Sequence, residues 1–294
     1  MNVDLASTRA DLPGVVGTLH VLGPIESRAL GPARPIYVWL PSSYETEVDR
    51  RYPVIYMQDG QNLFSDALAF GQEWQVDEHL ERLSALGVEA IVVGIPNAEE
   101  HRLDEYSPFA DAEGRGGRGD DYVRFVVDEL MPLITDRYRV LGTRAATGIL
   151  GSSMGALISL YAFLTRPEAF GFVGAMSPSI WFADAAILET AAAAPYAGAR
   201  IYLDIGTEEG EAHVAYVHHL HRLLVEKGYR QGESLMYVEE DHAGHTEAAW
   251  ARRLRTALYF LLPANTTRSL DGPASVRAPG AALAAPRPVR RRRP

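Results

Sequence analysis

The sequence predicts an α/β fold, in which a mostly parallel sheet is covered by helices on both faces. Short apolar runs rich in β-branched and aromatic residues recur along the chain, and helical patterns lie between the later runs. This alternation is typical of parallel sheets whose two faces are both buried. The length of 294 residues and the hydrophobic content of 47% are those of a globular protein.

Eight strands are predicted from the apolar runs. No helical pattern separates the first of these runs, so we expect the first strands to pair as antiparallel neighbours. The eight runs are Val15–Leu22, Ile36–Leu40, Val54–Gln58, Ala90–Ile95, Thr147–Gly151, Phe172–Met176, Ile201–Ile205 and Leu235–Val238.

Five segments repeat apolar residues at the spacing of an amphipathic helix. In the last segment, Trp250, Leu254 and Leu258 fall on one stripe. The five segments are Trp74–Leu86, Asp120–Tyr138, Met154–Leu164, His213–Lys227 and Thr246–Leu262.

Composition excludes several classes of protein. The chain has no cysteine, which excludes disulfides, zinc–thiolate sites and cysteine nucleophiles. No apolar run approaches the roughly 18–20 residues that span a bilayer, so we expect no membrane association. The first 28 residues lack the apolar core of a secretory signal, and we therefore expect a cytoplasmic protein.

The end of the chain differs in charge from the rest. Residues 265–294 hold seven arginines and one aspartate, a balance of +6, and a net charge of −10 therefore leaves −16 elsewhere. An acidic body argues against nucleic-acid binding. The proline- and alanine-rich end cannot build a packed core. We expect one domain over residues 1–263 and a disordered tail over 264–294.

The strongest chemical signal is a serine between a predicted strand and a predicted helix. Gly151-Ser-Ser153-Met154-Gly155 matches G-x-S-x-G, and the strand–turn–helix context is that of a nucleophile elbow. Small residues are needed because the turn crowds the backbone. The helix N-terminus would favour a developing oxyanion. The motif therefore predicts Ser153 as a nucleophile on an α/β-hydrolase fold.

A serine nucleophile needs a base and an orienting acid, which follow it in the order acid, then histidine. The acid should lie at or after the seventh predicted strand, where the candidates are Asp204, Glu208 and Glu209. Only two histidines, His242 and His245, follow the last strand. Those of the preceding helix (His213, His218, His219 and His221) have no third ligand beside them, so we expect helix packing and no metal site.

Two backbone N–H groups should form an oxyanion hole. One belongs to Met154, the residue after the nucleophile, and the other to the loop after the third strand. Gly60 lets that loop turn back toward the serine, so we expect the N–H of Gln61 to be the second donor and Gly60 to lie at the substrate. About 24 residues separate the sixth and seventh strands, which is too short for a large cap. Trp181, within that segment, is expected to form a wall of an open pocket.

Four segments resemble the family known as the putative esterases, which includes esterase D, enterochelin-type siderophore esterases and feruloyl esterases. They are Tyr56–Phe64 (YMQDGQNLF), Gly151–Gly155 (GSSMG), Gly206–Glu209 (GTEE) and His245–Trp250 (HTEAAW). The resemblance runs from about Gly17 to Leu262, and the stretch Arg102–Tyr106 also resembles a family segment near the cleft.

The resemblance implies particular residues and an activity. It implies Glu209 as the acid and His245 as the base of a carboxylesterase-type serine hydrolase that acts on a small-molecule ester, without a cofactor. Ala156 stands where the family often has glycine, and Thr246 where siderophore esterases tend to carry aspartate. Alternatives are an acyltransferase on the same fold, or a siderophore- or feruloyl-type esterase. The ester and the oligomeric state are not readable from the sequence.

Overall fold

A computed structural model describes residues 7–262 of the chain. The described residues contain a sheet of nine strands in the order β1-β2-β3-β5-β4-β6-β7-β8-β9. The strands are β1 (Ser7–Ala10), β2 (Thr18–Ser27), β3 (Gly31–Leu40), β4 (Val54–Gln58), β5 (Ile91–Ile95), β6 (Thr147–Ser152), β7 (Phe172–Met176), β8 (Arg200–Gly206) and β9 (Leu235–Glu240).

The sheet is mixed, with parallel pairing from β5 to β9. Strands β1, β2, β3 and β5 pair in antiparallel fashion, which confirms the expectation for the first strands. The prediction of eight strands was wrong, because it omitted β1. This strand is four residues long, lies at the edge of the sheet and is mostly exposed. It therefore has no apolar pattern from which it could be predicted.

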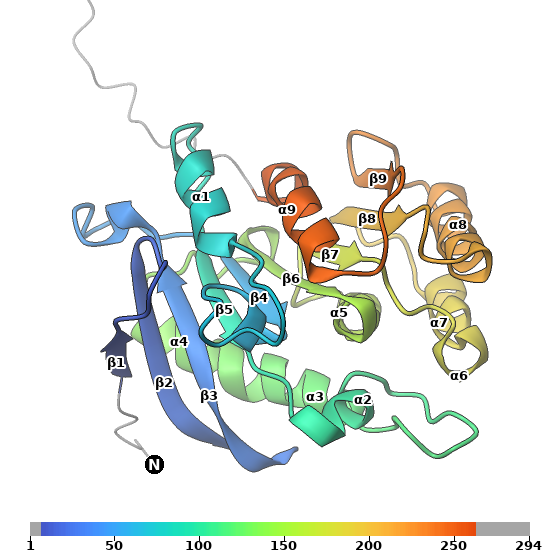
Figure 1. Cartoon of the computed structure of the whole chain (residues 1–294), viewed down its shortest axis with the longest axis horizontal. Coiled ribbons are helices and arrows are strands. Elements are labelled where there is room, and N and C mark those ends of the chain that lie inside the picture. The colour runs from blue at the N-terminus through green and yellow to red at the C-terminus, as the bar shows by residue number, and fades with distance from the viewer. Residues whose placement is uncertain (1–6, 263–294) are drawn as a thin grey trace, which may run out of the picture.

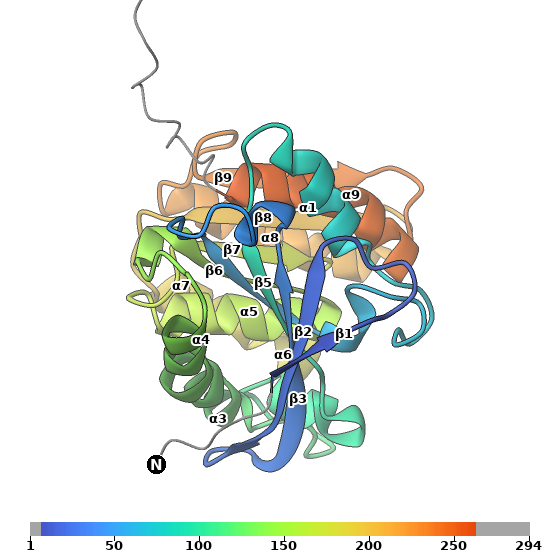
Figure 2. The ribbon, with the colours of Figure 1, turned by 90° about the vertical axis from the view of Figure 1, so that its left-hand side faces the viewer.

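Helices cover both faces of the sheet (Figures 1 and 2). Helices α1 and α9 pack together on one face, while α3, α4 and α5 lie on the other. The α-helices are α1 (Val76–Ser84), α2 (Arg102–Glu105), α3 (Gly119–Arg124), α4 (Met131–Arg137), α5 (Ser153–Thr165), α6 (Phe182–Ala185), α7 (Ile187–Ala193), α8 (Glu211–Glu226) and α9 (Glu247–Leu261). A π-helical segment, Phe125–Leu130, joins α3 to α4.

The core consists of two apolar layers, one on each face of the sheet. Successive residues of β4 alternate between them, since Ile55 and Met57 pack under α1 and α9 while Tyr56 packs on the α5 side. Burial of both faces explains why the central strands are apolar along their whole length. The rigid sheet fixes the positions of the loops that follow its parallel strands.

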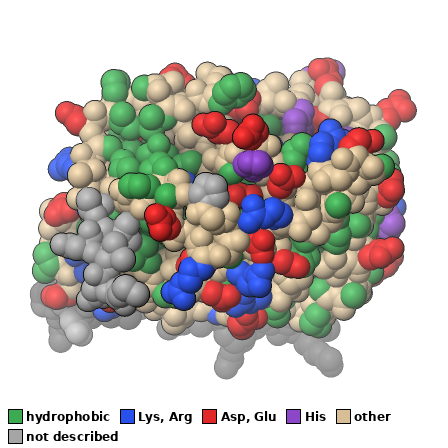
Figure 3. All heavy atoms as spheres, turned by 90° about the horizontal axis from the view of Figure 1, so that it is seen from below, with side chains coloured by type: hydrophobic (Ala, Val, Ile, Leu, Met, Phe, Trp, Pro, Cys, Tyr) green, Lys and Arg blue, Asp and Glu red, His purple; other side chains and the backbone are tan. Residues whose placement is uncertain are grey.

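None of the helices within residues 7–262 is long and apolar enough to cross a membrane. The predicted tail, 264–294, lies outside the described residues. On the face shown in Figure 3, basic side chains lie among acidic ones.

Candidate active site

Ser153 lies on a sharp turn between β6 and α5. Its φ of +54° is the left-handed backbone conformation, which a non-glycine residue adopts rarely. A Cβ at Gly151 would lie 2.5 Å from the backbone of Gly155, so the turn has no space for a side chain there. This is the strained strand–turn–helix geometry of a nucleophile elbow.

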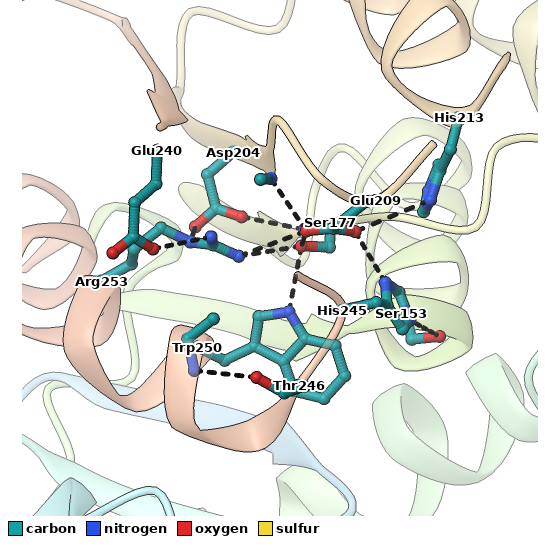
Figure 4. A network of polar contacts seen from close by, with 12 residues as sticks. Ser153, Ser177, Asp204, Glu209, His213, Glu240, His245, Thr246, Trp250 and Arg253 are labelled. Atoms are coloured by element: carbon teal, nitrogen blue, oxygen red, sulfur yellow. Dashed lines mark hydrogen bonds and ion pairs between the residues drawn. The ribbon is translucent and has the colours of Figure 1, made fainter. Parts of the chain in front are cut away.

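A continuous chain of hydrogen bonds joins Ser153, His245 and Glu209 (Figure 4). Ser153 Oγ lies 2.9 Å from His245 Nε2, and His245 Nδ1 lies 2.7 Å from Glu209 Oε2. The carboxylate accepts, so Nδ1 carries a proton and Nε2 is left to accept from the serine. The three side chains come from the ends of β6 and β8 and from the loop before α9. They have the arrangement of a nucleophile, a base and an orienting acid.

The side chain of Glu209 is fully buried and is held at both carboxylate oxygens. Its Oε1 accepts hydrogen bonds from Ser177 Oγ at 2.6 Å and from the Gly206 N–H at 2.8 Å. Burial acts to raise the pKa of Glu209, but the hydrogen bonds from His245, Ser177 and Gly206 outweigh it, so this pKa is lowered. The carboxylate is therefore ionised and oriented at neutral pH.

The other candidate acids and base lie elsewhere. Glu208 is exposed and pairs with His242, also exposed, at 3.2 Å. Asp204 is fully buried on the far side of Ser177, where it accepts from the Ser177 N–H at 2.9 Å. Neither carboxylate contacts His245.

His245 is positioned by the start of α9. Thr246 is the N-cap of this helix, and its hydroxyl accepts a hydrogen bond from the Ala249 N–H. Threonine and aspartate both favour this position, which explains how Thr246 can replace the aspartate common in siderophore esterases. The Trp250 ring packs edge-on against the His245 ring, with centroids 4.9 Å apart.

His213 also reaches this site, which the sequence did not predict. Its Nδ1 lies 3.6 Å from Glu209 Oε2, and its Nε2 donates to Pro178 O at 2.9 Å. Burial lowers the pKa of His213, even though the Pro178 carbonyl and Glu209 act to raise it. The imidazole is thus neutral at neutral pH. Helical periodicity could not reveal its proximity to Glu209, since that depends on where α8 begins.

A buried ionic network supports Glu209 from behind (Figure 4). Arg253 of α9 donates to Asp204 at 2.9 Å, to Glu240 at 3.0 Å and to Ser177 Oγ at 2.9 Å. Its side chain is only 4% exposed and lies 3.7 Å from Glu209 Oε1. One guanidinium thus neutralises several carboxylates and fixes the hydroxyl that holds Glu209.

Replacing Arg253 with methionine is expected to lower the free energy of unfolding by about 3–5 kcal/mol, because it leaves a buried carboxylate without its partner. Urea denaturation measures the change. The matched control is Arg252→Met, since Arg252 is 57% exposed and pairs with Glu240 at 3.0 Å, which predicts a loss of about 1 kcal/mol or less. Equal losses in the two variants would contradict the structural role of Arg253.

The predicted oxyanion loop lies after β4. Gln61 is the second residue of the 3₁₀ turn Gly60–Asn62, so its N–H has no partner within that turn. Met154 is likewise the second residue of α5, and its N–H has no partner within the helix. These two amides come from the turns at the carboxyl ends of adjacent strands, β4 and β6.

Asp59 holds the oxyanion loop in place. Its backbone is left-handed, with φ +53°, and its carboxylate accepts two hydrogen bonds from Arg102, both at 2.8 Å. Asn97 donates a third at 2.7 Å. The Arg102–Tyr106 stretch that resembles a family segment therefore acts on the oxyanion loop, through Arg102 and through Tyr106, whose hydroxyl accepts from the Asp59 N–H.

A cavity of about 1210 Å³ opens beside Ser153. Gln61, Ser153, His245 and Trp250 line it, together with Phe70 and Arg102. Two residues predicted at the substrate do not line this cavity. Gly60 is buried, with its Cα packed against β5, and Trp181 is 49% exposed with its ring against Phe182.

Gly60→Ala is expected to destabilise the protein by about 1–3 kcal/mol, the usual cost of overpacking. A Cβ here would lie 2.5 Å from the backbone of Gly94 and Ile95, which cannot move aside without distorting β5. Thermal unfolding gives the measurement. Gly244→Ala is the control, because a Cβ at Gly244 would meet no atom within 4 Å. An unchanged melting temperature in Gly60→Ala would show that the backbone of β5 can move to accept the added Cβ.

Comparison with known proteins identifies the family. The sequence model of the family described as "Putative esterase" matches residues 27–261, which is most of the chain. The chain belongs to this family. It is therefore an esterase, a hydrolase that acts on ester bonds, and the resemblance noted from the four sequence segments is confirmed.

Known relatives of the esterase differ in length. The uncharacterized protein YbbA of Bacillus subtilis is 29% identical over 79% of this chain and 94% of its own length. The iron(III) salmochelin esterase of Escherichia coli is 25% identical over 75% of this chain, but this covers only 52% of that protein. The enterobactin esterase FES of Shigella flexneri has the same fold, with a TM-score of 0.66, 22% identity and coverage of 87% of this chain and 58% of FES.

Proposed function

We propose that the esterase is a serine hydrolase with Ser153 as nucleophile, His245 as general base and Glu209 as orienting acid. The unbroken hydrogen-bond chain of 2.9 and 2.7 Å from Ser153 through His245 to Glu209 is the observation that carries this proposal. His245 takes the serine proton as Oγ attacks the ester carbonyl, and Glu209 stabilises the imidazolium that forms. His245 then protonates the leaving alcohol, and water releases the acyl group.

The amides of Met154 and Gln61 stabilise the oxyanion in this mechanism. An oxyanion donor contributes roughly 3–4 kcal/mol to the transition state. The Asp59–Arg102 pair keeps Gln61 in position, since each of its two hydrogen bonds is 2.8 Å long. Preorganisation of this kind avoids the reorganisation that water would need at the moment of reaction.

Water and a bulky ester can both reach the nucleophile. His245 is 36% exposed, and the cavity of about 1210 Å³ exceeds the roughly 300–1,000 Å³ of common ligand pockets. The described segment between β7 and β8 contains only the short helices α6 and α7, and we propose that no large cap closes the site. Bulk water can therefore reach the acyl-enzyme, which supports hydrolysis as the proposed reaction.

A siderophore-type ester is a second, narrower candidate for the substrate. The similarity to the iron(III) salmochelin esterase favours it, and the large cavity is compatible with it. An ester panel that varies the acyl and alcohol groups separately, and that includes a catecholate trilactone, tests both the esterase activity and the siderophore-type substrate. Hydrolysis of simple esters alone would leave the serine hydrolase in place and contradict the siderophore substrate. Product analysis with an added acceptor alcohol detects acyl transfer.

A further inference from the structure

Two imidazoles converge on one oxygen of Glu209. Oε2 lies 2.7 Å from His245 Nδ1 and 3.6 Å from His213 Nδ1. One potential ligand atom from each of the three residues lies within 4.8 Å of the other two. Figure 4 shows His213 and His245 approaching the carboxylate from different elements, α8 and the loop before α9.

His213 is oriented as a metal ligand would be. Its Nε2 donates to Pro178 O, and a carbonyl oxygen only accepts, so Nε2 carries the proton of the neutral ring and Nδ1 has a free lone pair. This lone pair faces a carboxylate oxygen and has no hydrogen to share with it. An N–H bond to a carbonyl on the remote nitrogen is the usual support of a metal-binding histidine.

Glu209 is likewise oriented as a metal ligand by hydrogen bonds to its other oxygen. Its Oε1 is occupied by Ser177 Oγ and the Gly206 N–H, which leaves Oε2 directed toward the two histidines. Hydrogen bonds of this kind to a ligating carboxylate are typical of metal sites. The sequence pattern offered no third ligand beside the histidines of α8. The fold supplies Glu209, four residues before His213, together with His245.

We propose that Glu209, His213 and His245 bind Zn²⁺, and that this binding inhibits the esterase. Two histidines and one glutamate with an open fourth position are an established donor set for zinc. Imidazole nitrogen selects against Mg²⁺ and Ca²⁺, which prefer oxygen. Bonds of about 2.0–2.1 Å place the donors of a tetrahedral site roughly 3.3 Å apart. The distance of 2.7 Å between Glu209 Oε2 and His245 Nδ1 must therefore lengthen, and the distance of 3.6 Å between Glu209 Oε2 and His213 Nδ1 must shorten slightly.

Zinc would block the reaction by occupying the orienting side of His245. The metal binds the lone pair of Nδ1, so the neutral imidazole carries its single proton on Nε2, and the cation occupies the former place of the Nδ1 proton between His245 and Glu209. Nε2 then has no free lone pair, and Glu209, bound to the metal, no longer stabilises an imidazolium, so the serine proton has no acceptor. The exposed edge of His245, whose side chain is 36% exposed, gives the ion a path. The inhibition rests on the proposed triad, whereas the zinc binding does not.

Inhibition is tested on the full chain after dialysis against a chelator, with a p-nitrophenyl ester as substrate. We expect ZnCl₂ to reduce turnover reversibly, and MgCl₂ to have no such effect. The ratio of the rates without and with zinc is measured for each variant. His213→Gln should weaken inhibition by about tenfold or more, because it removes one of three ligands. His221→Gln is the control, since His221 lies on the same helix but stacks on Tyr237. Equal sensitivity in all three proteins would overturn the proposal.

Calorimetric titration of ZnCl₂ into Ser153→Ala tests binding without activity, because this variant keeps all three ligands. We expect one zinc per chain in Ser153→Ala and a loss of that binding when His213→Gln or His213→Asn is added, with melting curves showing that each variant is folded. An unchanged titration in the folded double variants would contradict the site. Zinc binding in a wild-type chain that hydrolyses no ester of the panel would overturn the proposed function and leave the zinc site standing.

Discussion

Ser153→Ala is expected to lower kcat for ester hydrolysis by about a millionfold, the scale of losing the nucleophile of a serine hydrolase. The hydroxyl is the group that would form the acyl-enzyme, and among residues 7–262 it is the one hydroxyl that is hydrogen-bonded to His245 Nε2, at 2.9 Å. Rates are measured with an activated ester on protein purified free of host esterases. The fold should persist, since removing one oxygen creates no cavity in the core.

Ser152→Ala is the matched control for this prediction. Ser152 ends β6, is buried and also lines the cavity, but its side chain takes no part in the hydrogen-bond chain to Glu209. We expect its kcat to stay within a few fold of the wild-type value. A large loss of kcat in Ser152→Ala, together with an active Ser153→Ala, would show that the nucleophile is assigned one residue too late in the turn.

Glu209→Gln is expected to lower kcat by about 10⁴-fold, as for the amide replacement of other triad acids. The amide removes the charge that stabilises protonated His245 and disturbs the tautomer that leaves Nε2 free. The hydrogen bonds from Ser177 and Gly206 are formed to a carboxylate, so some loss of stability should accompany the loss of rate. Steady-state kinetics and urea denaturation separate the two effects.

Glu208→Gln controls for the charge of the same loop. Glu208 is 61% exposed and pairs with His242, so we expect nearly unchanged kinetics. A large effect at Glu208 with none at Glu209 would move the acid by one position and contradict the geometry. No effect at either residue would indicate that Ser153 and His245 act as a dyad.

The sequence predicts the parts of this protein that depend on local pattern. The bounds of β4 and β7 agree with the predicted runs residue for residue, because buried strands need continuous apolar sequence. The short polar edge strand β1 has no such pattern. The support of Glu209 was also missed, since Ser177 and Arg253 are 76 positions apart in the chain and meet only because α9 packs against β7 and β8.

The candidate site shows the same division between local and tertiary information. The turn that carries Ser153 is specified by five consecutive residues, Gly151–Gly155, so its position could be predicted from the sequence. The choice among Asp204, Glu208 and Glu209 needs the geometry of three loops, and the approach of His213 needs the start of α8. Gly60 was expected at the substrate from its turn propensity, whereas its close contact with Gly94 and Ile95 is a packing effect across strands.

Peptide mapping of the chain after reaction with a fluorophosphonate shows whether Ser153 is the nucleophile. We expect one adduct per chain, on the peptide that contains Ser153, and loss of labelling in Ser153→Ala but not in Ser152→Ala. An adduct on a different serine, or an active esterase that takes up no label, would contradict it.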